Sequence, residues 1–271
     1  MTAKPPSHTP KDSHYARLRR EHRERTQTAQ KPEDANRVRL YGLHSVRAAL
    51  ENPLRKKHRL LVTRNASQRL QWKPTHEDLQ PEIVEPRIID AMVGIDAVHQ
   101  GALLETEPLH TKRLDALGDA KLLLILDQVT DPHNVGAILR SAVAFGATAL
   151  ITTARHSPQE SGVLAKAASG ALEHIDHIEV RNLAEALGVL TDAGFQTLGL
   201  DSEGPAELER SFSGERIALV LGAEGKGLRQ KTRETVGTLA RLDMPGAIRS
   251  LNVSNAAAVS LYAARQYLMK V

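Results

Sequence analysis

The chain has 271 residues, of which 41% are hydrophobic, 25% are charged and none is cysteine. This length allows one large domain or two modest domains with hydrophobic cores. The absence of cysteine excludes disulfide frameworks, thiolate metal sites and cysteine nucleophiles. No apolar run approaches the roughly 18 residues of a membrane span, and the polar, basic N-terminus is unlike a signal peptide. We therefore expect a cytoplasmic protein that makes no contact with a membrane.

Charge is distributed unevenly along the chain. Residues 1–75 carry 18 Lys or Arg and six Asp or Glu, whereas residues 76–271 carry 18 and 26. A front quarter of net charge +12 on a body of net charge −8 favours a polyanionic partner for the front. A basic tail that is merely solvated is the alternative. Residues 1–36 are rich in proline and charge and poor in bulky apolar side chains, which predicts a disordered tail.

Residues 37–106 predict a small α/β domain. Its expected elements are a helix at 44–50, a strand at 59–63, a helix at 67–72, a strand at 83–85, a helix at 88–93 and a strand at 101–105. The weakly patterned segment 107–118 is interpreted as a linker.

Residues 119–271 alternate regularly between strand and helix patterns. Strands are expected at 121–126, 148–152, 178–180, 196–200 and 216–221, and helices at 134–145, 157–171, 183–192 and 252–269. Asn134 is placed to cap the first of these helices, and Ser157–Glu160 fits a capping box for the second. The alternation predicts an α/β fold with a mostly parallel sheet and helices on both of its faces.

Ligands of parallel sheets bind beyond the carboxyl ends of the strands, and three segments of this chain qualify. Asn134 and Arg140 follow the first strand, and the glycine-rich segment 221–228 follows a buried strand. The third segment places Ser250, Asn252 and Ser254 around the start of the last helix. Capping that helix requires only one polar side chain, so three such residues are more than a cap needs. Taken singly, each segment could be an ordinary loop.

The glycine-rich segment does not match the common nucleotide-binding motifs. Gln230 occupies the place of the third glycine in G-x-G-x-x-G, and the Lys-Ser/Thr pair of a Walker A loop is absent. This disfavours an NAD-dependent oxidoreductase. The histidines lack metal-ligand spacing, and we predict no metal.

Together the three segments resemble the motifs of the SpoU (TrmH) family of RNA ribose 2′-O-methyltransferases in the SPOUT superfamily. They match as Asn134-x-Gly136-x-x-x-Arg140, Gly222-Ala-Glu224-Gly225-x-Gly227 and Ser250-Leu-Asn252-Val-Ser254. The front domain is similar to the substrate-binding domain of that family, with Tyr41-Gly-Leu-His44 near its start and His99-Gln100-Gly101 near its end. One departure is Asp243 after Leu242, where the family has an apolar-Pro-Met opening.

The resemblance implies a deep C-terminal trefoil knot, a homodimer, an RNA partner and S-adenosylmethionine as methyl donor. The positions that match the catalytic and substrate-binding residues of the family are Asn134, Arg140, Glu224, Ser250 and Asn252. Those that would line the cofactor are Leu200, Gly222, Ala223, Gly227, Leu242 and Leu251. A guanidinium group stays protonated at neutral pH and is therefore a poor base. We therefore expect Arg140 to hold a phosphate and to stabilise the developing alkoxide, and its part in proton transfer stays open.

The resemblance thus implies methyl transfer from S-adenosylmethionine to a ribose 2′-hydroxyl of structured RNA. The two-domain layout favours a guanosine of large-subunit rRNA as the target. The alternatives are a tRNA 2′-O-methyltransferase and a catalytically silent RNA-binding or ribosome-assembly protein on the same scaffold. The presence of all four of Asn134, Arg140, Glu224 and Asn252 argues against a silent protein.

Overall fold

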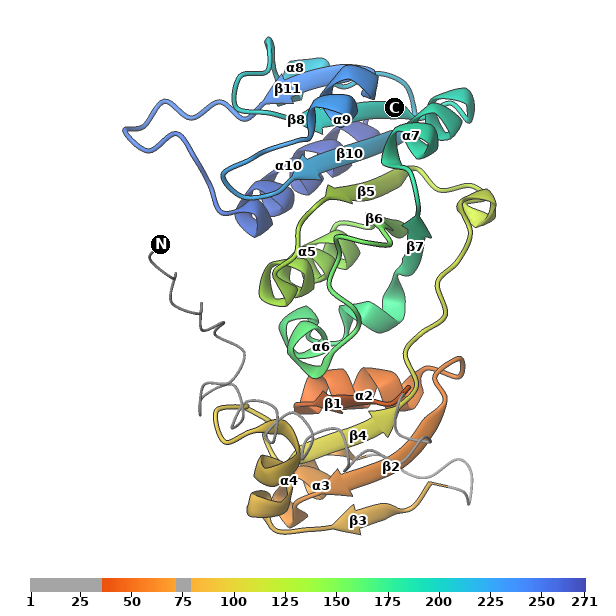
Figure 1. Ribbon diagram of the computed structural model, residues 1–271, viewed down its shortest axis with the longest axis vertical. Helices are drawn as coiled ribbons and strands as arrows, with labels where there is room; N and C mark the ends of the chain where they lie inside the picture. The colour runs from red at the N-terminus through yellow and green to blue at the C-terminus, as the bar shows by residue number, and fades with distance from the viewer. Residues whose placement is uncertain (1–35, 72–78) are drawn as a thin grey trace, which may run out of the picture. The chain divides into compact units, whose positions relative to one another are not determined.

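The computed structural model describes residues 36–71 and 79–271, so the predicted tail lies outside the described residues except for its last position. The predicted α/β class is confirmed, with one sheet of four strands and one of seven (Figure 1). In the part of the chain that the structure describes, no helix is long and apolar enough to cross a membrane.

The four-stranded sheet belongs to the front of the chain. Its strands are β1 (Val38–Tyr41), β2 (Lys57–Val62), β3 (Pro81–Ile83) and β4 (Ala102–Thr106), in the order β1-β4-β2-β3, with helices α2 (Leu43–Glu51), α3 (Arg64–Leu70) and α4 (Pro86–Val93). Strand β4 is antiparallel to β1 and β2, whereas β3 is parallel to β2. Successive side chains of β2 point to opposite faces of this sheet. Leu60 packs in the cluster that includes α2, and Leu61 packs on the other face with Ile89 of α4.

The seven-stranded sheet forms the rest of the fold, and all of its strands are parallel. Its strands are β5 (Leu122–Asp127), β6 (Ala149–Thr153), β7 (Asp176–Val180), β8 (Gln196–Leu200), β9 (Ala206–Glu207), β10 (Ile217–Gly222) and β11 (Thr238–Arg241), in the order β7-β6-β5-β10-β8-β11-β9. The connecting helices are α5 (Pro132–Ala144), α6 (Gly162–Ala168), α7 (Leu183–Asp192), α8 (Leu208–Ser211), α9 (Gln230–Thr235) and α10 (Val253–Leu268), with single 3₁₀ turns at Leu114–Ala116 and Ala171–His174. The carboxyl ends of all seven strands therefore lie at one edge, which we call the carboxyl edge.

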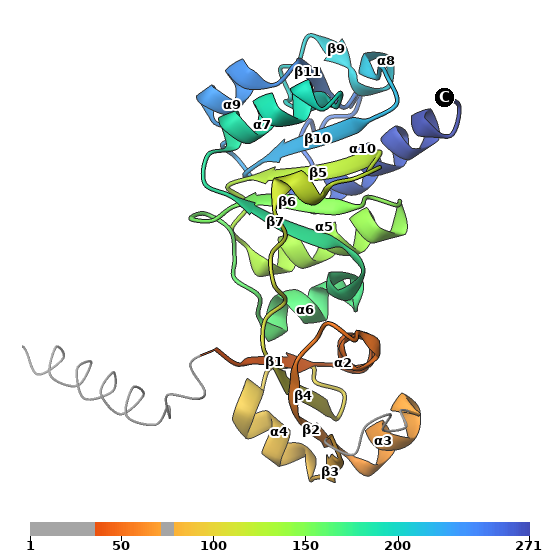
Figure 2. The same ribbon diagram turned by 90° about the vertical axis from the view of Figure 1, so that its right-hand side faces the viewer.

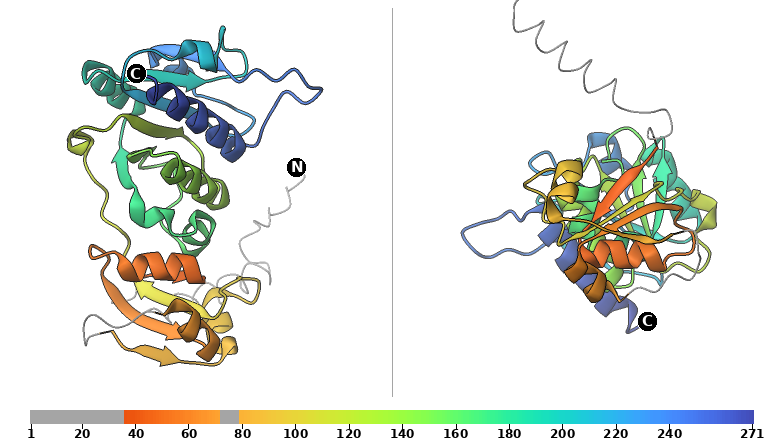
Figure 3. Two further views of the ribbon diagram at one scale, coloured as in Figure 1. Left: turned by 180° about the vertical axis from the view of Figure 1, so that it is seen from behind. Right: turned by 90° about the horizontal axis from the view of Figure 1, so that it is seen from below.

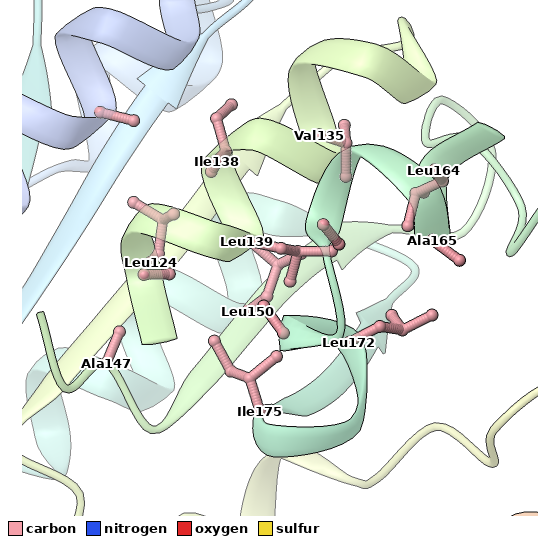
Figure 4. Packing of buried hydrophobic residues seen from close by; sticks show 14 of the residues in the cluster. Leu124, Val135, Ile138, Leu139, Ala147, Leu150, Leu164, Ala165, Leu172 and Ile175 are labelled. Carbon is pink, nitrogen blue, oxygen red and sulfur yellow. The ribbon is translucent and has the colours of Figure 1, made fainter. Parts of the chain in front are cut away.

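Helices cover both faces of this sheet, as predicted (Figure 2). Strand β5 is buried throughout, because Leu124 and its alternate neighbours pack under α5 and α10, whereas Leu123 and Ile125 pack under α7. Figure 4 shows Ile138 and Leu139 of α5 packed over Leu124 and Leu150 of the strands. Figure 3 shows α10 and α5 from behind, on the same face of the sheet.

Helix α5 begins two residues earlier than predicted. The Oδ1 atom of Asp131 accepts a hydrogen bond of 2.9 Å from the backbone N–H of His133, and Pro132 occupies the first helical position. The prediction that Asn134 caps this helix was therefore wrong, because Asp131 already supplies the cap. The side chain of Asn134 is consequently available for another contact.

The capping box predicted at Ser157–Glu160 was also wrong. Helix α6 starts at Gly162 and is capped by Ser161, whose hydroxyl accepts from the N–H of Leu164 at 3.3 Å. Glu160 instead receives hydrogen bonds from Arg55 and from the N–H of Leu109. A distant arginine thus binds the side chain that the local pattern assigned to the helix.

A backbone hydrogen bond holds part of the segment that connects the two sheets. The N–H of Lys112 donates to the carbonyl of His177 at 2.8 Å, so the predicted linker runs beside the edge strand β7. The predicted domain boundaries and the trefoil knot stay predictions.

Candidate functional site

The three segments singled out in the sequence lie at the carboxyl edge of the seven-stranded sheet. Strand β10 lies between β5 and β8, and β11 follows β8. The turn into α5 therefore neighbours the glycine-rich segment after β10. The long segment 242–252 after β11 leads back toward them and into α10 (Figure 1).

One residue from each segment joins a hydrogen-bonded cluster. The Nδ2 atom of Asn252 donates to Oδ1 of Asn134 at 3.0 Å and to Oε1 of Glu224 at 2.6 Å. The same Glu224 oxygen accepts from the backbone N–H of Val253 at 3.2 Å. We call Asn134, Glu224 and Asn252 the polar cluster. It fixes three loops relative to one another although its members are up to 118 residues apart in sequence.

Asn252 has a second role as the cap of α10. Its Oδ1 atom accepts from the backbone N–H of Ser254 at 2.8 Å and from the Ser254 hydroxyl at 2.5 Å. Asn252 and Ser254, two of the three polar residues around the start of α10, are thus hydrogen-bonded to each other. Ser250 is exposed, and the structure does not bring it into the polar cluster.

Arg140 lies on α5, six residues after Asn134, which corresponds to about 9 Å along the helix axis. It is exposed, and no carboxylate in residues 36–71 and 79–271 forms an ion pair with it. The structure therefore does not place Arg140 in the polar cluster either. Its guanidinium group is available to an anion from outside the chain.

The glycine-rich segment forms a tight hairpin, Gly222–Leu228. The N–H of Gly227 donates to the carbonyl of Ala223 at 2.8 Å, and φ is +73° at Gly225 and +63° at Gly227. A Cβ atom on Gly222 would lie 2.1 Å from the carbonyl carbon of Gly227, so only glycine fits there. The hairpin thus requires its glycines for its own shape and leaves backbone amides at the edge of the sheet.

The remaining predicted cofactor residues surround this hairpin. Leu200 ends β8 and Leu242 follows β11, both half-buried against the core, and Gly222 ends β10 beside them. Leu251, in the segment before α10, is 44% exposed. Apolar side chains next to accessible backbone amides suit a flat heterocycle that carries hydrogen-bonding edges. The residues present therefore fit the adenosyl group of S-adenosylmethionine.

Sequence reasoning missed the ion pair between Asp127 and Arg229 at this edge. The Asp127 side chain, fully buried at the end of β5, accepts from the Arg229 backbone N–H at 3.0 Å and from its Nε at 2.6 Å. Arg229 directly follows the glycine hairpin, so the pair anchors the end of the hairpin to the turn into α5. The available signals were an acid at the end of an apolar run and an arginine after the glycines.

No group of three His, Asp or Glu residues within 36–71 and 79–271 is arranged to hold a metal ion. The expectation of a metal-free site stays a prediction.

Known proteins match this chain along most of its length. A family model described as the SpoU rRNA Methylase family matches residues 121–262, and one described as RNA 2′-O ribose methyltransferase substrate binding matches residues 39–112. The 23S rRNA (guanosine-2′-O-)-methyltransferase RlmB of Ralstonia nicotianae is 44% identical over 171 residues, which cover 61% of this chain and 69% of that protein. RlmB of Pseudomonas putida is 35% identical over 249 residues, which cover 86% of this chain and 98% of that protein.

The fold has counterparts among solved structures. The SpoU methyltransferase AviRb from Streptomyces viridochromogenes, solved in complex with the cofactor AdoMet, matches with a TM-score of 0.73. The match covers 92% of this chain and 98% of AviRb at 20% identity. At 20% identity, this similarity shows a shared fold.

Proposed function

Because the chain belongs to the SpoU family of rRNA methylases, we propose that it transfers the methyl group of S-adenosylmethionine to the ribose 2′-oxygen of a guanosine in 23S rRNA. The observation that carries this proposal is the polar cluster beside the glycine hairpin, since methyl acceptor and methyl donor must meet at one edge. The reaction takes place in the cytoplasm, where the RNA substrate is.

The chemical difficulty lies with the acceptor, because a ribose hydroxyl is almost never ionised at neutral pH. When bound, S-adenosylmethionine would supply a methyl group on a positively charged sulfur, and transfer to the ribose oxygen would release neutral S-adenosylhomocysteine and the proton of the hydroxyl. The protein then has to hold the oxygen in line with that methyl group. Asn134 orients the ribose through its own Nδ2 group, and Asn252 holds Asn134 in place through its 3.0 Å hydrogen bond. Glu224 in turn keeps Asn252 in place through its 2.6 Å hydrogen bond.

Arg140 contributes the positive charge of its guanidinium group to the reaction. Its planar guanidinium group binds a phosphate of the RNA through two parallel hydrogen bonds and stabilises the negative charge that develops on the 2′-oxygen. Its exposure and its lack of an ion-pair partner among the described residues support this role. Ser250 lies two residues before Asn252, and its exposed hydroxyl helps to hold the same ribose.

We further propose a homodimer that forms through α10 and the end of α5. Val259 and Tyr262 on α10 are 46% and 53% exposed, and Tyr262 packs edge-to-face on Phe145 with ring centroids 5.7 Å apart. An aromatic and aliphatic surface of this kind is typical of subunit interfaces. Sedimentation should give twice the monomer mass for the wild-type protein and the monomer mass for Tyr262→Glu.

Nucleoside mapping in cells tests the proposed reaction. We expect 23S rRNA from a strain without the gene to lack one 2′-O-methylguanosine, and the wild-type gene to restore it. A loss confined to tRNA would favour the tRNA 2′-O-methyltransferase. No loss in any RNA, together with a defect in ribosome assembly, would favour the silent scaffold protein.

A further inference from the structure

Two neighbouring strands of the seven-stranded sheet are each followed by an arginine at the carboxyl edge. Strands β6 and β7 are paired up to Thr153 and Val180, and the N–H of Ala154 then donates to the carbonyl of Val180 at 3.1 Å. Arg155 and Arg181 are the next residues on the two segments. This hydrogen bond keeps the two backbones adjacent at the point where Arg155 and Arg181 follow.

Both arginines are exposed, and neither forms an ion pair within the residues that the structure describes. The nearby carboxylate of Glu185 is occupied, since it accepts from Nδ2 of Asn182 at 2.7 Å. Two positive charges held next to each other repel, which favours an anionic ligand between them.

The segment that carries Arg155 also contains two buried hydroxyl groups. The side-chain oxygens of Thr153 and Ser157 form no hydrogen bond with any described residue, and Thr153 is only 4% exposed. Buried polar groups normally form hydrogen bonds. An anion bound at this turn would offer them acceptors after a small adjustment of the turn.

The position of this pair relates it to the path of the substrate. Strand β6 lies next to β5, and β7 follows, so by the usual spacing of strands their ends are about 5 Å and about 10 Å from the end of β5, where the turn into α5 begins. The same segment ends at Gly162, where a Cβ atom would lie 2.3 Å from the carbonyl oxygen of Arg39 on β1. It thus connects the carboxyl edge to the four-stranded sheet at the front of the chain.

We propose that Arg155 and Arg181 bind a backbone phosphate of the RNA next to the nucleotide that is methylated. This inference rests on the proposed function, because it assumes an RNA substrate at the polar cluster. A phosphate suits the pair because guanidinium groups bind its oxygens through several parallel hydrogen bonds. Such an interaction positions the RNA without reading its sequence.

The test compares Arg155→Ala, Arg181→Ala and the double variant with Arg210→Ala, which removes the same charge near the opposite edge strand β9. With 23S rRNA as the substrate, KM should rise about tenfold for each site variant. The log–log salt dependence of RNA binding should become shallower by about 0.7 to 0.9 for each phosphate that the protein no longer binds. The kcat, the affinity for S-adenosylmethionine and the thermal midpoint should stay at wild-type values, and lysine at both positions should recover part of the RNA affinity.

The outcomes separate this inference from the proposed function. A wild-type protein that methylates RNA, with site variants that keep KM and salt dependence, would overturn the inference alone. A wild-type protein that does not methylate RNA would overturn the proposed function. Site variants that unfold at lower temperature and are not rescued by lysine would show a structural role and would also overturn the inference.

Discussion

Arg55 is expected to contribute more to stability than any exposed arginine of the front domain. Its side chain is fully buried, with Nη1 2.5 Å from Oε1 of Glu160 and Nη2 2.5 Å from Oε1 of Glu173. It also donates to the carbonyl of Glu107 at 3.0 Å. One guanidinium group thus forms ion pairs with two carboxylates whose side chains are only 11% and 2% exposed.

Arg55→Ala leaves both carboxylates in place without their counter-charge. Removing one partner of a buried ion pair costs about 3–5 kcal/mol, and we expect the free energy of unfolding to fall by that amount. Burial raises the pKa of the Glu160 carboxyl, and the charge of Arg55 opposes this rise. Without Arg55 that pKa should rise further. A carboxyl with a raised folded-state pKa destabilises the protein as the pH increases through the interval above its unfolded pKa.

Urea denaturation followed by circular dichroism at pH 5 and pH 8 measures both effects. The deficit of Arg55→Ala should be larger at pH 8, and adding Glu160→Gln should recover part of it. The control is Arg59→Ala, which breaks a pair with Glu82 whose side chains are 43% and 47% exposed. Exposed pairs contribute about 1 kcal/mol or less. An Arg55→Ala deficit as small as this control, or one independent of pH, would refute the role given to the buried charges.

Three further predictions concern the edge of the sheet and one helix. Gly222→Ala should abolish binding of S-adenosylmethionine, measured by calorimetry, because its Cβ atom would clash with the hairpin. The control Gly246→Ala should bind normally, because a Cβ atom there meets nothing within 4 Å. Equal affinities of the two variants would contradict the hairpin geometry. Asp127→Ala should weaken binding of S-adenosylmethionine and lower the free energy of unfolding by about 2–4 kcal/mol, because two hydrogen bonds from Arg229 disappear. An unchanged melting temperature would contradict this prediction. Gly188→Ala should stabilise α7 by about 0.5–1 kcal/mol in denaturation, and a lower stability would show a hidden clash.

The sequence predicted most of the longer elements because their signals are local, but it did not predict β1, β9, α8 or α9. The apolar run of β5 and the periodicity of α7 lie within single segments, and the structure places both as expected. One failure came where a local signal competed with a distant partner. Glu160 has the spacing of a capping box, but Arg55 lies 105 residues away and binds it.

In the candidate site, too, local motifs were predicted and contacts between distant residues were not. Motif resemblance singled out Asn134, Glu224 and Asn252 one by one, and only the fold joins them through hydrogen bonds across 28 and 118 residues. The Asp127–Arg229 pair could not be predicted, because a pairing across 102 residues has no local pattern. Capping of α5 by Asp131 was predictable in principle, since Asp-Pro is a common start of a helix.

Single-turnover methylation of 23S rRNA, with analysis of the methylated nucleoside, tests the proposed reaction most directly. We expect 2′-O-methylguanosine as the product of the wild-type protein. For Arg140→Ala we expect a rate lower by about 10²- to 10³-fold, with unchanged affinity for S-adenosylmethionine, because a group that stabilises developing charge is removed. A methyl group on a base, or an Arg140→Ala protein that reacts at the wild-type rate, would contradict this mechanism.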